Sequence, residues 1–261
     1  MSAILLEGGI VHYEVIGRGR PIIFLHGWLG SWRYWVPAMQ TASTGFRAYA
    51  LDMWGFGDTA RDAALYGLDK QVSLLDHFLQ ELGMGKVAIV GHGLGALVGL
   101  LFTMRYPTVV DRIMAVEVPF DATAVNNRLR NTSLQELTDW LLTKDAFSEP
   151  VRTDGLKADP LAISASFNSP DLFNLSHRLG SLHNPCLLVY GQNDPAITAP
   201  IFDTVSAPIN MHAVTLEQSA HFPMLDDPAR FNRLLTDFLA LESGESPRDL
   251  QMKEEWRRRV R

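Results

Sequence analysis

The sequence predicts an α/β fold, in which a mostly parallel, eight-stranded sheet carries helices on both faces and a helical insertion. Two observations support this prediction. Short apolar runs of strand length recur along the chain, as expected for parallel strands that are buried on both faces. Amphipathic helical patterns lie between these runs, and such alternation is typical of a doubly wound sheet. With 261 residues, 47% of them hydrophobic, the chain is long enough to bury the core of one such domain.

The elements are expected in the following order. Residues 4–6 and 10–16 have the pattern of two strands joined by a glycine turn. The clearest helix has apolar residues at spacings of three and four from Leu68 to Leu82 and ends at Gly83. The remaining strands are expected over the apolar runs at residues 21–25, 46–51, 87–90, 113–118, 186–190 and 211–216.

Two stretches depart from this alternation. Residues 121–183 are rich in polar residues and carry helical patterns punctuated by prolines, so they predict a helical insertion between core segments at residues 1–120 and 184–242. Residues 243–261 begin with a linker-like cluster and end in a run of arginines. We expect this basic tail to be solvated, with docking to an acidic partner or an anionic surface as the alternative, and the sequence identifies no partner for it.

Composition excludes several classes of function. The net charge of −6 argues against a nucleic-acid partner, because phosphate binding requires a basic surface. The single cysteine, Cys186, begins an apolar strand and is expected to be an inert core thiol in a reducing cytoplasm. No apolar run is long enough for a transmembrane segment, and the N-terminus lacks a signal-peptide pattern, so a cytoplasmic protein is expected. No metal-binding motif is present, and we expect neither a metal nor another cofactor.

Five motifs follow one another along the chain. They are FLHGW at residues 24–28, LDMWGFGD at 51–58, GHGLG at 91–95, LLVYGQND at 187–194 and SAHFP at 219–223. In this order they resemble the α/β-hydrolase superfamily, in its lid-bearing branch of esterases, lactonases, haloperoxidase-like enzymes and C–C bond hydrolases. The resemblance covers roughly residues 3 to 240, and it implies the α/β-hydrolase fold with a helical lid at residues 121–183.

The resemblance also assigns the catalytic positions. In the G-x-S-x-G pattern the middle residue is the serine nucleophile, held at a strained turn between a strand and a helix. Here that residue is Gly93, which has no side chain. His221 stands where the family places its catalytic base and Asp194 where it places the acid that orients the base. The backbone N–H groups of Trp28 and Leu94 correspond to the oxyanion hole, and none of the nearby residues is an obvious substitute nucleophile.

The predicted pocket is aromatic and apolar, which favours a small, mostly apolar ligand with one carbonyl-like oxygen. One of its candidates, His26, usually braces its own loop in the family. Trp140 lies in the insertion and is equally compatible with packing between the insertion and the core. The candidate substrate-binding residues are His26, Trp54, Phe120, Trp140 and Phe222.

The missing hydroxyl leaves four functions open. The first is an enzyme that acts on an ester or a lactone-like compound through a His221–Asp194 dyad, which deprotonates water or the substrate without an acyl-enzyme. The second is a pseudoenzyme that binds a ligand or a partner, and the third is a serine ester hydrolase with an introduced serine-to-glycine change at position 93. The fourth is a dinucleotide-binding protein, because Gly91-x-Gly93-x-x-Ala96 matches the G-x-G-x-x-G/A fingerprint and Glu117 ends the next strand.

Overall fold

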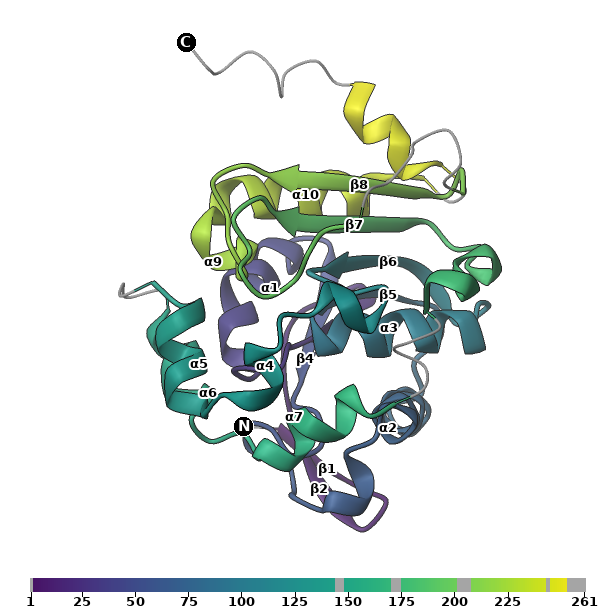
Figure 1. The fold of residues 1–261 in the computed structure, drawn as a ribbon. Helices are drawn as coiled ribbons and strands as arrows, with labels where there is room; N and C mark the ends of the chain where they lie inside the picture. Colours follow the sequence, from purple (N-terminus) through teal and green to yellow (C-terminus); the bar gives the residue numbers. More distant parts are fainter. Residues whose placement is uncertain (1, 144–147, 170–174, 201–207, 243–244, 253–261) are drawn as a thin grey trace.

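Eight strands form one sheet in the described part of the chain, which is every residue of a computed structural model except 1, 144–147, 170–174, 201–207, 243–244 and 253–261. The strand order is β1-β2-β4-β3-β5-β6-β7-β8 (Figure 1). The pairings of β1 with β2 and of β2 with β4 are antiparallel, and the other five are parallel. The strands are β1 (Ser2–Leu6), β2 (Gly9–Gly17), β3 (Arg20–Leu25), β4 (Phe46–Leu51), β5 (Val87–His92), β6 (Val110–Val116), β7 (Cys186–Gly191) and β8 (Met211–Leu216).

The predicted mostly parallel, eight-stranded sheet is therefore confirmed, with one strand shifted. The apolar run predicts a strand over residues 113–118, whereas β6 begins at Val110 and ends at Val116. Val110 pairs with Val87 across an irregularity in register, which apolar patterning does not reveal. The strand ends early because Glu117 has a φ of 48°, in the left-handed region that strand residues do not adopt.

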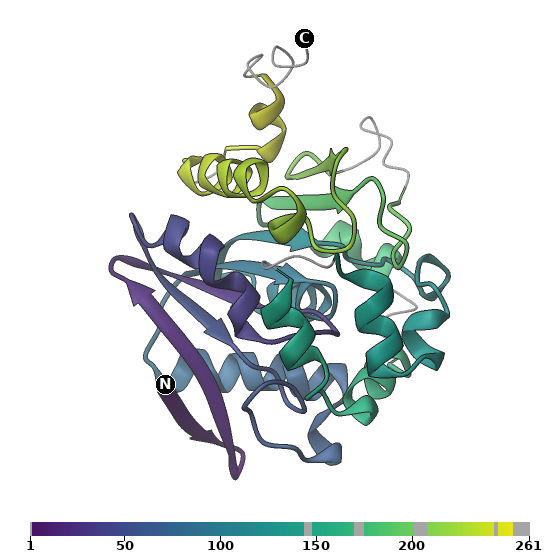
Figure 2. The same ribbon diagram turned by 90° about the vertical axis from the view of Figure 1, so that its left-hand side faces the viewer.

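Helices cover both faces of the sheet (Figure 2). The predicted helix after β4 is α2 (Leu68–Glu81), whose apolar stripe is buried and which is followed by Gly83 at a φ of 59°. It packs on α3 (Leu94–Arg105), which follows β5 and is buried along most of its length. On the other face, α1 (Val36–Ala42) packs on α10 (Pro228–Ala240). The short α9 (Pro223–Asp226) leads into α10.

The described helices of the predicted insertion include α4 (Arg128–Asn131), α5 (Leu134–Leu141), α6 (Glu149–Gly155) and α7 (Pro160–Phe167). Local sequence defines where two of them begin. Ser133 and Glu136 form a capping box at α5, and Asp159 accepts a hydrogen bond from the Leu161 N–H at the start of α7. In Figure 1, α4, α5 and α6 gather at the end of the sheet toward which the parallel strands point.

Part of the C-terminal tail packs on the edge of the sheet. A short 3-10 helix, η5 (Pro247–Met252), lies against β8. The guanidinium of Arg248 donates from Nε to the Met211 carbonyl at 3.2 Å, and Leu250 is buried. This segment is therefore partly buried against the sheet, whereas the arginines of residues 257–261 lie outside the described residues.

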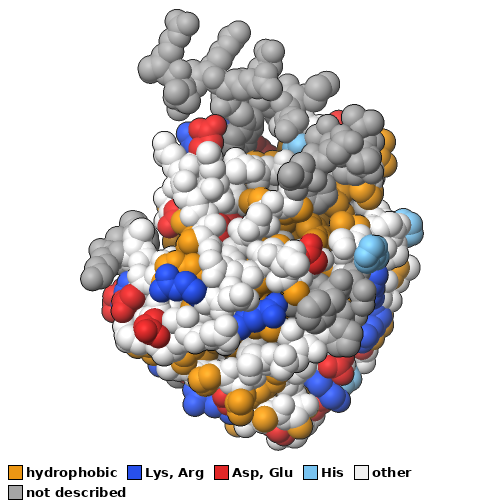
Figure 3. Space-filling view, in the orientation of Figure 1, with side chains coloured by type: hydrophobic (Ala, Val, Ile, Leu, Met, Phe, Trp, Pro, Cys, Tyr) orange, Lys and Arg blue, Asp and Glu red, His pale blue; other side chains and the backbone are white. Residues whose placement is uncertain are grey.

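Surface charge and hydropathy give no sign of a bilayer-spanning helix. On the face in Figure 3, lysine and arginine side chains are interspersed with aspartate and glutamate. Within the described ranges, every helix is too short or too polar to cross a membrane.

Candidate active site

The GHGLG motif forms a tight turn between β5 and α3. Gly93 precedes α3 with φ 50° and ψ −110°, a region that residues with a Cβ rarely occupy. A Cβ at Gly91 would collide with the Gly95 carbonyl, and a Cβ at Gly95 would collide with the Leu25 carbonyl. Both flanking glycines are therefore required by backbone packing. The turn keeps the conformation of a nucleophile elbow although it carries no nucleophile.

The indole of Trp28 covers the position of the missing side chain. A Cβ at Gly93 would lie 3.0 Å from both Cε3 and Cζ3 of Trp28. The indole also stacks on Phe167, with ring centroids 5.0 Å apart and an interplanar angle of 20°. Its Nε1–H donates to Ser166 Oγ at 2.8 Å. Trp28 therefore connects the loop after β3 to the end of α7, directly above Gly93.

His221 and Asp194 form a buried pair beside the elbow. His221 lies between β8 and α9, Asp194 follows β7, and His221 Nδ1 is 2.9 Å from Asp194 Oδ2. Both side chains are only 1% exposed. Burial acts to raise the pKa of Asp194, but the charge and hydrogen bond of His221, with further hydrogen bonds, outweigh it and lower that pKa. The ionised Asp194 thus accepts a hydrogen bond from Nδ1–H of His221, and this tautomer leaves Nε2 as the nitrogen with a free lone pair.

Two backbone donors remain available at the same place. In the described part of the chain, neither the Trp28 N–H nor the Leu94 N–H has a hydrogen-bond acceptor. Their neighbours are engaged, because Gly95 N–H donates to the His26 carbonyl and Gly27 N–H donates to Tyr34 Oη. Leu94 begins α3, where the helix dipole favours negative charge. These two groups have the chemistry of an oxyanion hole.

A second histidine, His92, connects His221 to the loop after β3. Burial lowers the pKa of His92 well below its usual value, so the ring is neutral. Its Nε2–H donates to the His221 carbonyl at 2.8 Å, and its Nδ1 accepts from the Tyr34 hydroxyl at 3.0 Å. The same hydroxyl accepts from Gly27 N–H at 2.6 Å. Sequence reasoning did not identify Tyr34 or Ser166, because nothing in the pattern relates either one to the motifs.

The candidate substrate-binding residues are placed in different environments. Phe222 contacts the site, with its ring centroid 5.1 Å from that of His221. Both ring nitrogens of His26 are hydrogen-bonded, since Nδ1–H donates to the Gly27 carbonyl at 2.8 Å and Nε2 accepts from the N–H of Met53, in the loop after β4, at 3.0 Å. Burial lowers the pKa of His26, which keeps this arrangement neutral.

The other three candidates make contacts with different parts of the described chain. Trp54 packs against Gly9, at the hairpin between β1 and β2. Trp140 lies on α5 with the Arg128 guanidinium 4.5 Å from the centre of its ring. Phe120 is buried after β6, and its carbonyl accepts from Ser176 N–H at 3.2 Å.

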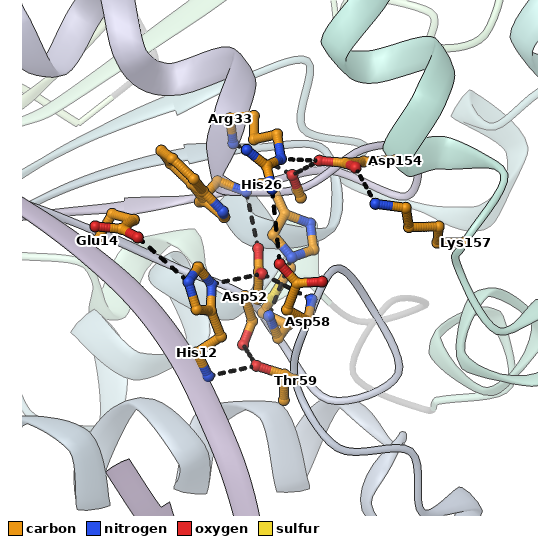
Figure 4. A network of polar contacts seen from close by, with 12 residues as sticks. His12, Glu14, His26, Arg33, Asp52, Asp58, Thr59, Asp154 and Lys157 are labelled. Carbon is orange, nitrogen blue, oxygen red and sulfur yellow. Dashed lines mark hydrogen bonds and ion pairs between the residues drawn. The ribbon is translucent and has the colours of Figure 1, made fainter. Parts of the chain in front are cut away.

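A polar network around Asp52 connects the loops after β3 and β4 (Figure 4). Asp52 Oδ1 accepts from Trp32 N–H at 2.8 Å, and Oδ2 accepts from Asp58 N–H at 3.0 Å and lies 3.0 Å from His12 Nδ1. The ligand atoms of His12, Asp52 and Asp58 lie within 4.8 Å of one another. Both oxygens of Asp52 are nevertheless occupied by N–H donors. The cluster therefore braces the loops after β3 and β4 rather than offering a carboxylate to a cation.

This network predicts a dependence of stability on pH. The hydrogen bond to Asp52 raises the pKa of His12, outweighing burial. Because the folded-state pKa exceeds the unfolded value of 6.5, the stabilisation is fully present below pH 6.5 and is lost as pH rises through the raised pKa. In His12→Gln the amide keeps a hydrogen bond without the charge. Urea unfolding should show this variant about 1 kcal/mol less stable than the native protein at low pH, with the two curves converging at high pH.

The control is His77→Gln, because His77 is exposed and pairs with Glu7 at the surface. The stability of His77→Gln should equal that of the native protein at every pH measured. Curves for His12→Gln and the native protein that stay parallel across this pH range would contradict the assignment.

Comparison with known proteins places these features in a family. A model of the alpha/beta hydrolase family matches residues 22–234. Among curated proteins, the chain is 25% identical to the 2-hydroxy-6-oxo-2,4-heptadienoate hydrolase of Pseudomonas putida, over 93% of this chain and 97% of that protein. It is 24% identical to human epoxide hydrolase 4, over 89% of this chain and 76% of that protein.

Solved structures show the same fold. The enol-lactonase of Burkholderia xenovorans superposes with a TM-score of 0.78 at 16% identity, covering 92% of this chain and 100% of that one. An esterase from Exiguobacterium antarcticum superposes with a TM-score of 0.80 at 16% identity, covering 92% and 99%.

Proposed function

Because this chain belongs to the alpha/beta hydrolase family, we propose that it is a hydrolase-type enzyme that acts without a serine nucleophile on a small, mostly apolar carbonyl compound, such as an ester or a lactone. One observation carries this proposal. The His221–Asp194 pair, at 2.9 Å and fully buried, stands beside an elbow that has no side chain at its central residue, Gly93. A charged acid buried in this way would be costly without a role for the histidine it orients.

The proposed chemistry uses the groups that remain. His221 Nε2 takes a proton from a water molecule, and the resulting hydroxide adds to the carbonyl carbon of the substrate. The negative charge that develops on the carbonyl oxygen is stabilised by the N–H groups of Trp28 and Leu94. The imidazolium is stabilised by Asp194 and returns its proton to the leaving oxygen as the tetrahedral intermediate collapses. A substrate with an acidic C–H could be deprotonated by the same base.

The relatives support a carbonyl substrate, since an enol-lactonase and an esterase share the fold. The dinucleotide alternative has less support, because the Trp28 indole covers Gly93 and one carboxyl oxygen of Glu117 accepts from Gly191 N–H. A pseudoenzyme and an introduced change at position 93 stay open as alternatives.

An activity panel tests the proposal directly. Short-chain aryl esters and lactones are incubated with the protein, with a His221→Ala preparation purified in parallel as the blank. Saturable turnover above that blank is the expected result. If no compound of the panel is turned over above the blank, the result would contradict an enzymatic function and favour a ligand-binding pseudoenzyme.

The absence of a hydroxyl at the elbow predicts the response to a serine-directed probe. The protein should form no covalent adduct with a fluorophosphonate, because phosphonylation requires a nucleophilic oxygen beside the base. Intact-protein mass spectrometry measures the adduct, and an esterase with an intact G-x-S-x-G motif is the positive control. Stoichiometric labelling of a serine near His221 would show that the chain has a nucleophile at another position.

A further inference from the structure

Glu117 occupies a position that is unusual for its residue type. It follows β6 and is fully buried, and its φ of 48° lies in the left-handed region that is unfavourable for a side chain of this kind. Its backbone N–H donates to the Val189 carbonyl at 2.9 Å, and its side-chain Oε1 accepts a close hydrogen bond from Gly191 N–H. The strained backbone thus directs a carboxyl group against the end of β7, from which Asp194 follows.

The second oxygen of Glu117, Oε2, is buried and has no hydrogen-bond donor among the described residues. The group within hydrogen-bonding reach is the carboxyl of Asp194. Two carboxylates in contact in a water-poor site would repel each other strongly, whereas a single proton between them makes a strong hydrogen bond.

The charges around this pair favour the same arrangement. Asp226, from α9, adds a further negative charge that opposes ionisation of Glu117, and Tyr190 approaches from β7. Asp194 is kept ionised by His221 on its other side. Burial, followed by the charge of Asp194, raises the pKa of Glu117 well above its usual value. The two acids therefore differ, one neutral and one charged.

We propose that Glu117 is a positioning residue of the site, a neutral carboxylic acid whose Oε2–H donates to Asp194 and holds that carboxylate toward His221. Asp194 then accepts three hydrogen bonds: from Glu117, from His221 Nδ1 at 2.9 Å and from Ala196 N–H at 2.7 Å. With three donors the carboxylate has one orientation, which also fixes the imidazole. The catalytic consequence rests on the proposed function, but the protonation state is measured without turnover.

The substitution Glu117→Gln is the sharpest test, because glutamine copies a neutral acid. Its amide oxygen can accept from Gly191 N–H, its amide nitrogen can donate to Asp194, and it keeps the same backbone strain. The pKa of His221, followed by NMR of its imidazole in labelled protein, should be unchanged. Asp194→Asn is the positive control, in which loss of a real charge should lower the pKa of His221. A lowered pKa in Glu117→Gln would show that Glu117 is ionised and would overturn the proposal.

Stability against pH gives an independent readout. Because Glu117 holds its proton in the folded state beyond the unfolded pKa of 4.5, the native protein should lose stability as pH rises above 4.5. Glutamine does not titrate, so Glu117→Gln should become progressively more stable than the native protein over that range. The opposite trend, or failure of this variant to fold, would overturn the proposal.

Turnover rates distinguish a positioning role of Glu117 from a role in packing alone. Glu117→Gln should retain kcat/KM, whereas Glu117→Ala should lose about 100-fold through a misplaced Asp194. Equal losses in both variants would contradict a positioning role. If no substrate is turned over by the native protein, the proposed function fails, while the NMR and stability readouts still decide the state of Glu117.

Discussion

Replacing His221 with alanine is expected to reduce turnover by about 10² to 10⁴-fold, the usual contribution of a general base. Asp194→Asn should have a loss of similar size. The asparagine amide would donate to Nδ1, so the proton would move to Nε2, and the basic nitrogen would no longer face the site. Both side chains are buried in mutual contact at 2.9 Å, so neither loss can be compensated by solvent. Initial rates on the best substrate of the ester and lactone panel measure kcat/KM.

Two controls keep this result interpretable. Circular dichroism and urea unfolding establish that each variant is folded. His183→Ala removes an exposed histidine of the insertion and should leave the rate unchanged. If His221→Ala and Asp194→Asn both retain the native rate, the activity arises elsewhere or from a contaminant.

Restoring the nucleophile should produce the other large effect. Gly93→Ser is expected to gain fluorophosphonate labelling and ester hydrolysis, because the proposed base His221 and the proposed oxyanion donors, the N–H groups of Trp28 and Leu94, are already in place. The variant should also lose about 1 to 3 kcal/mol of stability, since a residue with a Cβ is strained at φ 50°. Trp28 adds to this cost, because the new Cβ would lie 3.0 Å from its ring.

Two further variants control for the backbone strain at position 93 and for the contact of the new side chain with Trp28. Gly93→Ala has the same Cβ and the same strain without the hydroxyl, so it should lose stability equally and label not at all. Combining Gly93→Ser with Trp28→Leu should speed labelling, because the smaller side chain makes room for the hydroxyl. If the double variant folds but neither labels nor hydrolyses any ester, the pocket is not built for acyl transfer, and a binding function becomes the better explanation.

Much of the fold was predictable because each element depends on a local pattern. Buried parallel strands need continuous apolar runs, and the stripe from Leu68 to Leu82 specifies one face of α2. The resemblance carried by the order of the motifs predicted that Asp194 and His221 would meet. They do so because each follows one of two neighbouring parallel strands, β7 and β8, at the same end of the sheet. The early end of β6 was not predictable, because the positive φ of Glu117 depends on contacts with β7.

The remainder of the site depends on contacts between distant segments. Trp28 and Ser166 are 138 residues apart, and no local signal relates an indole N–H to one serine hydroxyl among several. The aromatic candidates show the same limitation. A tryptophan in a loop can face a pocket or the core equally well, and Trp54 packs on the hairpin at Gly9 whereas Phe222 packs on His221.

The placement of Trp28 has a mechanical consequence for any ligand. Trp28 carries both the backbone N–H that is proposed as an oxyanion donor and the indole that is anchored to α7 through Ser166 and Phe167. Any displacement of α7 would therefore also displace Trp28, whose backbone N–H is the donor proposed to bind the oxygen of a ligand. The same indole would report such a displacement as a shift in its fluorescence, because its N–H bond to Ser166 and its stacking on Phe167 would change.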